Sequence, residues 1–161
     1  AGQTYTTLKA ACDAMNAGTI TGNCTFYITS DLTEAANVGL GVNTGGYSIT
    51  FRPSADVDRT ITFTQLTDNA SPTGHFVIGY LGSGLSSAWS DANTIATSNV
   101  TIDGYAEGST NKRLIFTNTN ASHTSARVFV VVGACENTVI KNCIINNLTN
   151  FWCKNGSGKL C

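Results

Sequence analysis

Charged residues are scarce in this chain of 161 residues: they make up 12% of it, about half of their usual share in globular proteins. The net charge is −1, so the chain has no basic field to gather nucleic acid or anionic lipid. No apolar run approaches the roughly 20 residues that a helix needs to cross a bilayer. These shortages argue against a nucleic-acid partner and a membrane span, and they leave Thr, Ser, Asn and Gly to cover the surface.

Histidines and metal-binding cysteine spacings are equally rare. The two histidines, His75 and His123, lie far from any cysteine cluster, and no C-x-x-C pair occurs, so a zinc site is not expected. The same two histidines give no Ser/His/Asp arrangement, and no Gly-rich phosphate loop follows a strand and opens a helix. We therefore predict no catalytic set, no metal site and no cofactor.

Asp56 and Asp58 are the acidic residues whose spacing invites a functional interpretation. Two acids two residues apart can share a face and bind calcium, but the adjacent Arg59 offers simple charge balance. We favour turn chemistry over a metal site. Asp103 before Gly104 is interpreted as a turn residue by the same reasoning.

The cysteines form an even set: Cys12, Cys24, Cys135, Cys143, Cys153 and Cys161. Their number allows many pairings, so the sequence does not fix the connectivity, and all six are disulfide candidates. With the low charge they favour an oxidising, extracellular or cell-surface location. The alternative is buried free thiols that pack as small hydrophobic groups, which suits Cys143. The chain begins at Ala1 without methionine, which we interpret as a processed N-terminus, although a recombinant product can begin in the same way.

What the chain does have is a short pattern that recurs. Each run holds a few residues, many of them β-branched, and ends in Asn, Gly or Asp, as expected for a strand followed by a turn. The runs cover residues 25–29, 48–52, 60–64, 76–78, 99–104, 114–118, 127–133, 137–142 and 143–147. No clear Asn-Gly turn joins neighbouring runs into hairpins. The pattern predicts an all-β parallel β-solenoid, with hydrophobic residues inside, threonine outside and Gly-rich corners at 39–41 and 45–46.

Residues 5–18 form the one convincing helix of the sequence. Thr6 or Thr7 can cap it, Gly18 ends it, and its hydrophobic face holds Leu8, Ala11, Cys12 and Met15. We expect this helix to cover the open first coil, with a Cys12–Cys24 disulfide adding about 2–3 kcal/mol.

The whole chain is predicted to be one domain, residues 1–161: a cap helix and first turn in 1–24, coils in 25–149 and a C-terminal tail in 150–161. Residues 79–98 are predicted to be a long loop, in which Trp89 is either the anchor onto the solenoid wall or an exposed contact residue, and we favour the anchor. The tail breaks the strand pattern, so the last coil is expected to be thinly covered. Phe151 and Trp152 then either cover that coil or receive another subunit, and Cys153 and Cys161 can bridge the tail into a small loop.

Five segments carry a resemblance to a known family: residues 5–18, 18–22, 49–54, 99–104 and 137–143. They resemble secreted surface proteins of Bacteroidetes-type bacteria. The resemblance covers roughly residues 4–149 and implies a pectate-lyase-like right-handed parallel β-helix, exported to the cell surface and often adhesin-like. The chain departs from the family in being short and in carrying Cys12 and Cys24 where ordinary apolar residues are expected.

Our first functional hypothesis is a non-enzymatic extracellular structural or adhesive protein, which self-associates through coil ends into a filament. The second is a module that binds or cleaves polysaccharides, for which Trp89, Tyr80, Tyr105 and Asp103 are the available residues. A third, ice binding, is suggested by Thr60, Thr62 and Thr64, but the irregular spacing of the runs argues against it.

Overall fold

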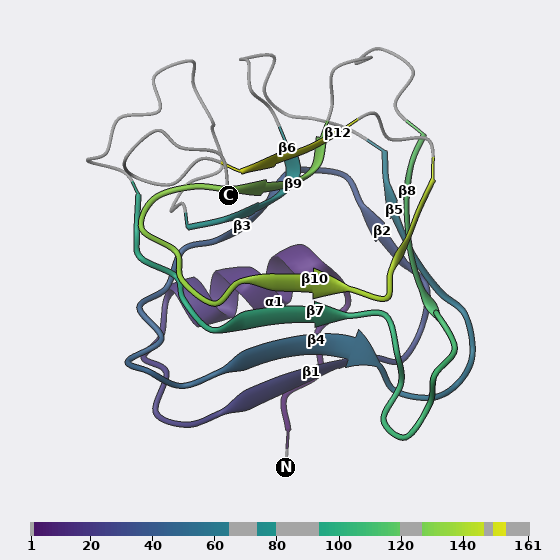
Figure 1. Ribbon diagram of the computed structural model, residues 1–161, viewed down its shortest axis with the longest axis horizontal. Coiled ribbons are helices and arrows are strands. Elements are labelled where there is room, and N and C mark those ends of the chain that lie inside the picture. Colours follow the sequence, from purple (N-terminus) through teal and green to yellow (C-terminus); the bar gives the residue numbers. More distant parts are fainter. Residues whose placement is uncertain (1, 65–73, 80–93, 120–126, 147–149, 154–161) are drawn as a thin grey trace.

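The computed structural model describes residues 2–64, 74–79, 94–119 and 127–146, and the backbone of residues 150–153 (Figure 1). Within these ranges the chain forms one helix, α1 (Leu8–Asn16), and twelve short strands. In chain order the strands are β1 (Cys24–Ile28), β2 (Leu32–Glu34), β3 (Val38–Leu40), β4 (Ile49–Pro53), β5 (Arg59–Phe63), β6 (Gly74–Ile78), β7 (Val100–Asp103), β8 (Leu114–Asn118), β9 (Arg127–Val131), β10 (Val139–Lys141), β11 (Ile144–Asn146) and β12 (Asn150–Cys153). The predicted predominance of strands is confirmed.

The strands form three four-stranded sheets, and the pairing between them is parallel throughout. The first sheet has the order β1-β4-β7-β10, the second β2-β5-β8-β11 and the third β3-β6-β9-β12. Each strand therefore pairs with the strand three places away in the chain. We call three successive strands, one in each sheet, a circuit, and the chain completes four circuits (Figure 1). The expected parallel pairing without hairpins is confirmed for these strands.

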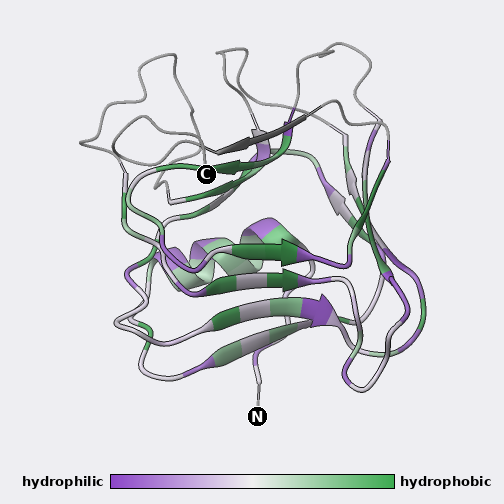
Figure 2. Cartoon of the chain, in the orientation of Figure 1, coloured by the Kyte–Doolittle hydropathy of each residue, from purple (hydrophilic) through white to green (hydrophobic). Residues whose placement is uncertain are grey.

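Buried residues of the strands form the hydrophobic core, and they alternate with more exposed residues in β4 and β8. Figure 2 shows hydrophobic residues along the strands of the first sheet. Because the registers are aligned, inward residues form columns across the circuits, such as Phe26, Phe51, Ile102 and Ile140 in the first sheet. Phe116 joins two columns, because its ring centroid lies 4.9 Å from that of Phe129 and 6.5 Å from that of Phe63. Such aromatic pairs add about 0.5–1.5 kcal/mol each beyond the burial of their area.

Threonine side chains form columns on the outside, as predicted. One column contains Thr25, Thr50 and Thr101 of the first sheet, and another contains Thr33, Thr62 and Thr117 of the second. All six threonines are partly or fully exposed. Their β-branched side chains suit the pleated surface while their hydroxyl groups face water.

Polar side chains stack between circuits at the corner where the chain enters the first sheet. This asparagine corner consists of Asn23, Ser48, Asn99 and Asn137, which precede β1, β4, β7 and β10. The Ser48 N–H donates to Asn23 Oδ1 at 3.0 Å, and Asn137 Nδ2 donates to Asn99 Oδ1 at 3.0 Å. Asn99 and Asn137 have φ angles of 59° and 53°, in the left-handed region that asparagine tolerates better than most residues. The corner therefore sets the turn and holds neighbouring circuits in register.

Helix α1 packs on β3 and β2, the strands that begin the third and second sheets. It spans Leu8–Asn16, within the predicted residues 5–18, because Thr7 is the N-cap and accepts a hydrogen bond from the Ala10 N–H at 3.0 Å. The buried face is the predicted one: Leu8, Ala11, Cys12 and Met15. The helix thus covers β2 and β3 of the first circuit, as we expected for a cap.

Asn16 joins the end of α1 to the free edge of β3. Its Nδ2 atom donates to Gly39 O at 2.8 Å, and its Oδ1 atom accepts from the Gly41 N–H at 2.9 Å. The side-chain amide thus takes the place of a neighbouring strand. This contact satisfies backbone groups that an edge strand would otherwise leave to water or to another chain.

Three strands lie where none was predicted. β2 and β3 contain three residues each, too few for alternation to be recognised, and two residues of the predicted corner, Gly39 and Leu40, belong to β3. The predicted break of the pattern after residue 150 is wrong for the backbone, because β12 pairs with β9 and Trp152 lies beside Val130 in the register. The side chains of Phe151 and Trp152 and the residue Trp89 lie outside the described part, so their roles stay predictions.

Candidate functional site

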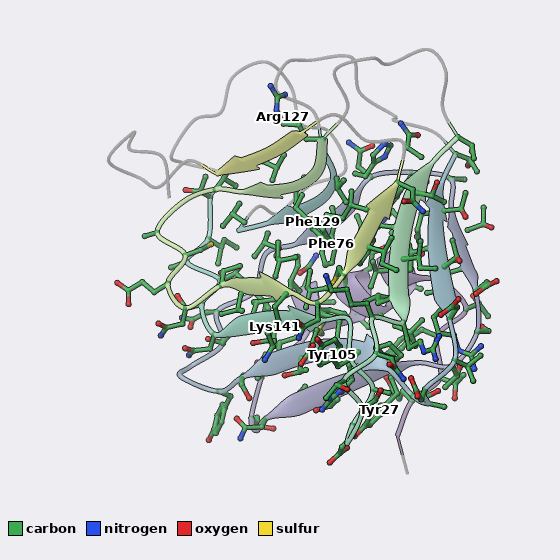
Figure 3. All side chains as sticks on the ribbon, turned by 45° about the vertical axis from the view of Figure 1, so that its right-hand side comes forward. Tyr27, Phe76, Tyr105, Arg127, Phe129 and Lys141 are labelled. Carbon is green, nitrogen blue, oxygen red and sulfur yellow. The ribbon has the colours of Figure 1, made fainter. Side chains whose placement is uncertain are left out.

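The outer face of the first sheet gathers polar and aromatic side chains from all four circuits. Tyr27 lies beside Arg52 in the register, and Asp103 lies beside Lys141. Figure 3 shows Tyr27, Tyr105 and Lys141 in that order along this side of the molecule. The Arg52 guanidinium donates to the Tyr105 carbonyl oxygen at 3.2 Å from Nε and 3.1 Å from Nη2. We call Tyr27, Arg52, Asp103 and Lys141 the outer row.

Asp103 is the most constrained member of the outer row. Its Oδ1 atom accepts from the Tyr105 N–H at 3.1 Å and from Asn142 Nδ2 at 2.9 Å, and its Oδ2 atom lies 3.4 Å from Lys141 Nζ. Burial opposes ionisation of Asp103, but these donors outweigh it and lower the pKa of the carboxyl group below its ordinary value. The group is therefore an ionised hydrogen-bond acceptor at neutral pH rather than a general acid. The structure thus brings together Asp103 and Tyr105, two of the residues predicted for polysaccharide contact, whereas Tyr80 and Trp89 lie outside the described residues.

Asp56 and Asp58 are held by Arg113 of the next circuit, not by Arg59 as predicted. Arg113 Nε lies 2.7 Å from Asp56 Oδ1, and its Nη1 atom lies 3.0 Å from Asp58 Oδ1. Asn111 also donates to Asp56 at 2.8 Å. The hydrogen bond from Arg113, followed by that from Asn111, lowers the pKa of Asp56. The ion pairs of Arg113 with the two acids therefore join the corners of neighbouring circuits. Arg113 is too far from these acids in the sequence for the contact to be predicted.

Glu34 is a buried carboxylate that sequence reasoning missed. It is 1% exposed and accepts the backbone N–H groups of Leu8 at 2.5 Å and Lys9 at 3.2 Å, two first-turn donors of α1 that have no partner within the helix. Burial raises the pKa of Glu34, and the two N–H donors counteract it only in part. The two hydrogen bonds to its carboxyl group join α1 to β2 of the first circuit.

The described cysteines are free thiols: Cys12, Cys24, Cys135 and Cys143. The predicted Cys12–Cys24 disulfide is therefore not formed. Cys12 is fully buried on the inner face of α1, whereas the Cys24 thiol donates to Gly22 O at 3.4 Å. Cys153 and Cys161, with their predicted bridge, lie outside the residues whose side chains are described.

Burial raises the pKa of three of these thiols, those of Cys12, Cys135 and Cys143, and so favours their protonated form. Burial, followed by the charge of Glu34, raises the pKa of Cys12, and burial together with the charge of Asp103 raises the pKa of Cys143 to about 12. Because the thiolate is the reactive species, neither side chain is suited to act as a nucleophile at neutral pH. Cys143 thus follows the predicted alternative of a thiol that packs as a hydrophobic group.

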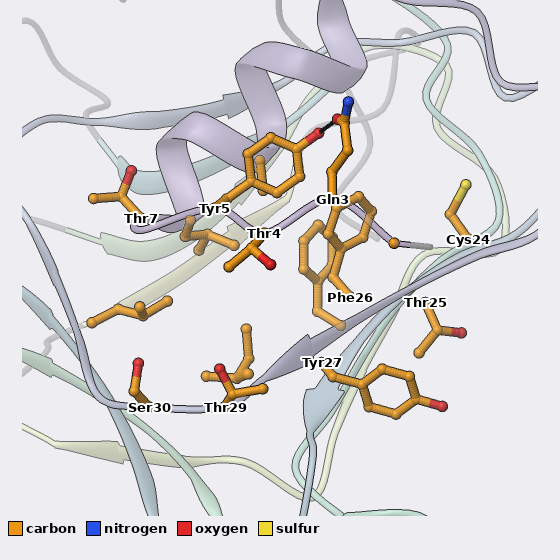
Figure 4. Close-up of a pocket in the computed structure, with 16 residues that line it drawn as sticks. Gln3, Thr4, Tyr5, Thr7, Cys24, Thr25, Phe26, Tyr27, Thr29 and Ser30 are labelled. Atoms are coloured by element: carbon orange, nitrogen blue, oxygen red, sulfur yellow. Dashed lines mark hydrogen bonds between the residues drawn. The ribbon is translucent and has the colours of Figure 1, made fainter.

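A cavity of about 540 Å³ opens at the first circuit, between the N-terminal residues and β1 (Figure 4). Its hydrophobic side includes Phe26, which stacks on Phe51 at a centroid distance of 5.2 Å and tilts against Tyr5 at 6.3 Å. Leu32 of β2 and the α1 residues Leu8 and Ala11 also line this side. Every residue from 24 to 30 borders the cavity, so it follows the free edge of β1. We call it the first-circuit cavity.

The last circuit exposes hydrophobic surface at the opposite end of the sheets. Ile145 of β11 is aligned with Phe116, which is aligned with Ile61, and both of these are buried in the core. Ile145 therefore occupies an inward-facing position, yet it is 44% exposed. Ile140 and Cys143 beside it are only partly buried. The last coil was expected to be thinly covered, and open hydrophobic surface is found at its β10–β11 corner.

The described carboxylates with shifted pKa values are engaged in structural contacts, and no group of three or more His, Cys, Asp or Glu side chains in the described residues can hold a metal ion. None of the helical residues described is part of a helix long and apolar enough to cross a membrane. Comparisons with protein-family models, with curated proteins and with solved structures find no match to this chain.

Proposed function

We propose that this chain is a non-enzymatic structural or adhesive module of the cell exterior, built as a right-handed parallel β-helix that self-associates through its ends. Four circuits visit the three sheets in one order, as a helical winding of the chain requires. The sparse charge, the external threonine columns and the resemblance to secreted β-helix surface proteins support an exported scaffold. The Glu34 carboxylate holds α1 on the first circuit, and Asp56 and Asp103 hold neighbouring circuits together, which supports a structural use of the carboxylates.

The observation that carries the proposal is the exposure of Ile145. An inward-facing isoleucine is normally covered by a further layer of the core, and full burial of such a side chain stabilises the fold by about 1.5–3 kcal/mol. At 44% exposure Ile145 has much of that stabilisation still to gain. A further layer, supplied by another subunit, provides it.

Sedimentation velocity of the purified protein across nanomolar to high micromolar concentrations tests self-association, with negative-stain microscopy of the most concentrated sample. We expect the mean sedimentation coefficient to rise with concentration and short rods to be visible. A reducing-sugar assay on plant and microbial polysaccharides should detect no release. A species that stays monomeric at every concentration contradicts the assembly, and released sugar contradicts the non-enzymatic role.

A second function, polysaccharide binding, is favoured by one observation on the outer row. Tyr27 is 49% exposed beside Arg52, so an aromatic face and a hydrogen-bond donor stand together on a regular surface. Glycan-array binding tests it, with Tyr27→Ala compared with Tyr47→Ala. Tyr47 is similarly exposed, at 41%, but lies before β4, outside the row. Loss of binding in the first variant alone supports the function, and equal binding by both contradicts it.

A further inference from the structure

Hydrophobic residues of the first and second sheets border open space at both ends, although α1 also packs on β2 at the first circuit. At the first circuit the cavity borders β1 and Leu32 of β2, the first strands of the first and second sheets. At the last circuit the exposed Ile145 and the partly buried Ile140 belong to β11 and β10, the last strands of those sheets. The third sheet differs, because Asn16 of α1 occupies the edge of β3. Hydrophobic surface at one end is therefore aligned with a hydrophobic cavity at the other.

The free edge of β1 can form backbone hydrogen bonds. Toward β4, the Cys24 N–H donates to Ser48 O, and Ile28 O accepts from Ser54. Because successive residues of a strand direct their N–H and C=O groups to opposite sides, those of Thr25 and Tyr27 face the first-circuit cavity. An extended segment laid along this edge would pair with them as an added strand.

The register predicts which side chains would meet if a second copy follows the first. Ile145 belongs to the column of Ile61, whose first-circuit member is Leu32. Ile140 belongs to the column whose first-circuit member is Phe26. Both first-circuit residues line the cavity, so the exposed end of one copy carries the hydrophobic side chains that the cavity of another copy lacks.

We propose that the first-circuit cavity is the receptor for the β10–β11 corner of a second copy of this chain, in a head-to-tail contact limited to the first and second sheets. This inference rests on the proposed function, because it assigns polarity to that self-association. The contact is heterologous, so each copy keeps one free end and growth continues as an open chain.

Two variants that each block one end test this polarity. Ile145→Asp places a charge on the exposed end. Thr25→Pro removes an N–H from the free edge of β1, where proline is tolerated because the β4 pairing is unaffected. Val57→Asp is the matched control, because Val57 is 52% exposed in the corner between β4 and β5, away from both ends. Circular dichroism and melting temperature verify folding, and Ser30→Arg, on an exposed wall residue of the cavity, replaces Thr25→Pro if the proline variant melts early.

Sedimentation velocity then gives separate outcomes. Each blocked variant alone should show a dissociation constant raised more than about tenfold, while their equimolar mixture forms a heterodimer that stops growing, because only one junction is intact. Val57→Asp should assemble like the wild type. Assembly of Thr25→Pro or Ser30→Arg alone, or failure of the mixture to pair, overturns the head-to-tail contact while the proposed function stands. A wild type that never associates overturns both.

Discussion

Gly104→Ala is expected to destabilise the protein strongly although it adds a single methyl group. Gly104 is buried at the corner after β7, and its N–H donates to Lys141 O of the next circuit at 2.9 Å. A Cβ atom there would lie 1.8 Å from the Asn142 carbonyl oxygen and 2.8 Å from the Cys143 nitrogen. Both neighbours are backbone atoms, so the two circuits must move apart at this corner.

The cost follows from the contacts that such a movement disrupts. Overpacking a tight site costs about 1–3 kcal/mol. Loss of the Gly104–Lys141 hydrogen bond adds about 0.5–1.5 kcal/mol, and weakening of the hydrogen bond from Asn142 to the Asp103 carboxylate adds to it. We therefore expect a loss of about 2–4 kcal/mol in the free energy of unfolding, which lowers the melting temperature by about 4–16 °C for a chain of this length.

Urea unfolding followed by far-ultraviolet circular dichroism measures this difference. The matched control is Gly22→Ala, because a Cβ atom at Gly22 meets nothing within 4 Å and the residue has no positive φ. The control should stay within about 0.5 kcal/mol of the wild type. If Gly104→Ala were as stable as the control, the circuits would not approach each other as closely as described, and the argument from stacked corners would be refuted.

Three further predictions concern the buried acids and thiols. Glu34 has a raised pKa in the folded state, so its contribution to stability is fully present below about pH 4.5 and is lost as the pH rises through the folded pKa. The stability of Glu34→Gln, measured by urea titrations, should therefore rise relative to that of the wild type between pH 4 and 7. A difference that stays constant with pH would contradict the burial effect. Asp103 has a lowered pKa in the folded state, so its contribution to stability is present above its unfolded pKa and is lost as the pH falls through the folded pKa. Asp103→Asn should lower the free energy of unfolding by about 1–3 kcal/mol at pH 7 and by progressively less below pH 4. A loss that stays the same in acid would contradict the lowered pKa. Cys12 and Cys143 should resist iodoacetamide at pH 8 in the folded protein and react after unfolding, as peptide mass spectrometry can determine; rapid labelling of either in the folded state would contradict the raised pKa values.

The parts of the fold that could be predicted from sequence are those with a local signal. The helix has a cap at Thr7 and a hydrophobic face, and the longer strands alternate threonine with Phe or Ile, so both were recognised. β2 and β3 have only three residues and owe their strand conformation to pairing with β5 and β6. Strand formation there is a tertiary effect that local alternation does not encode.

The site residues were harder to predict because their partners lie in other circuits. Asp56 and Arg113 are 57 positions apart, and Glu34 caps a helix that begins 26 positions before it. The disulfide prediction failed for a related reason: spacing makes Cys12 and Cys24 plausible partners, but the helix turns one into the core and the strand places the other at a corner. Asparagines recur before strands in the sequence, but only the register of the strands shows that they contact each other at one corner.

The pairing of every strand with the one three places away has a consequence for how fast the protein folds. Paired residues are separated by between 22 positions, from Val131 to Cys153, and 55 positions, from Ile61 to Phe116. None of the twelve described strands pairs with its neighbour in the chain as a hairpin, so each pair must close a long loop before its hydrogen bonds compensate for the lost chain entropy. Refolding should therefore be slow for a domain of this size, and nascent chains should expose unpaired strands until a second circuit arrives to cover the first.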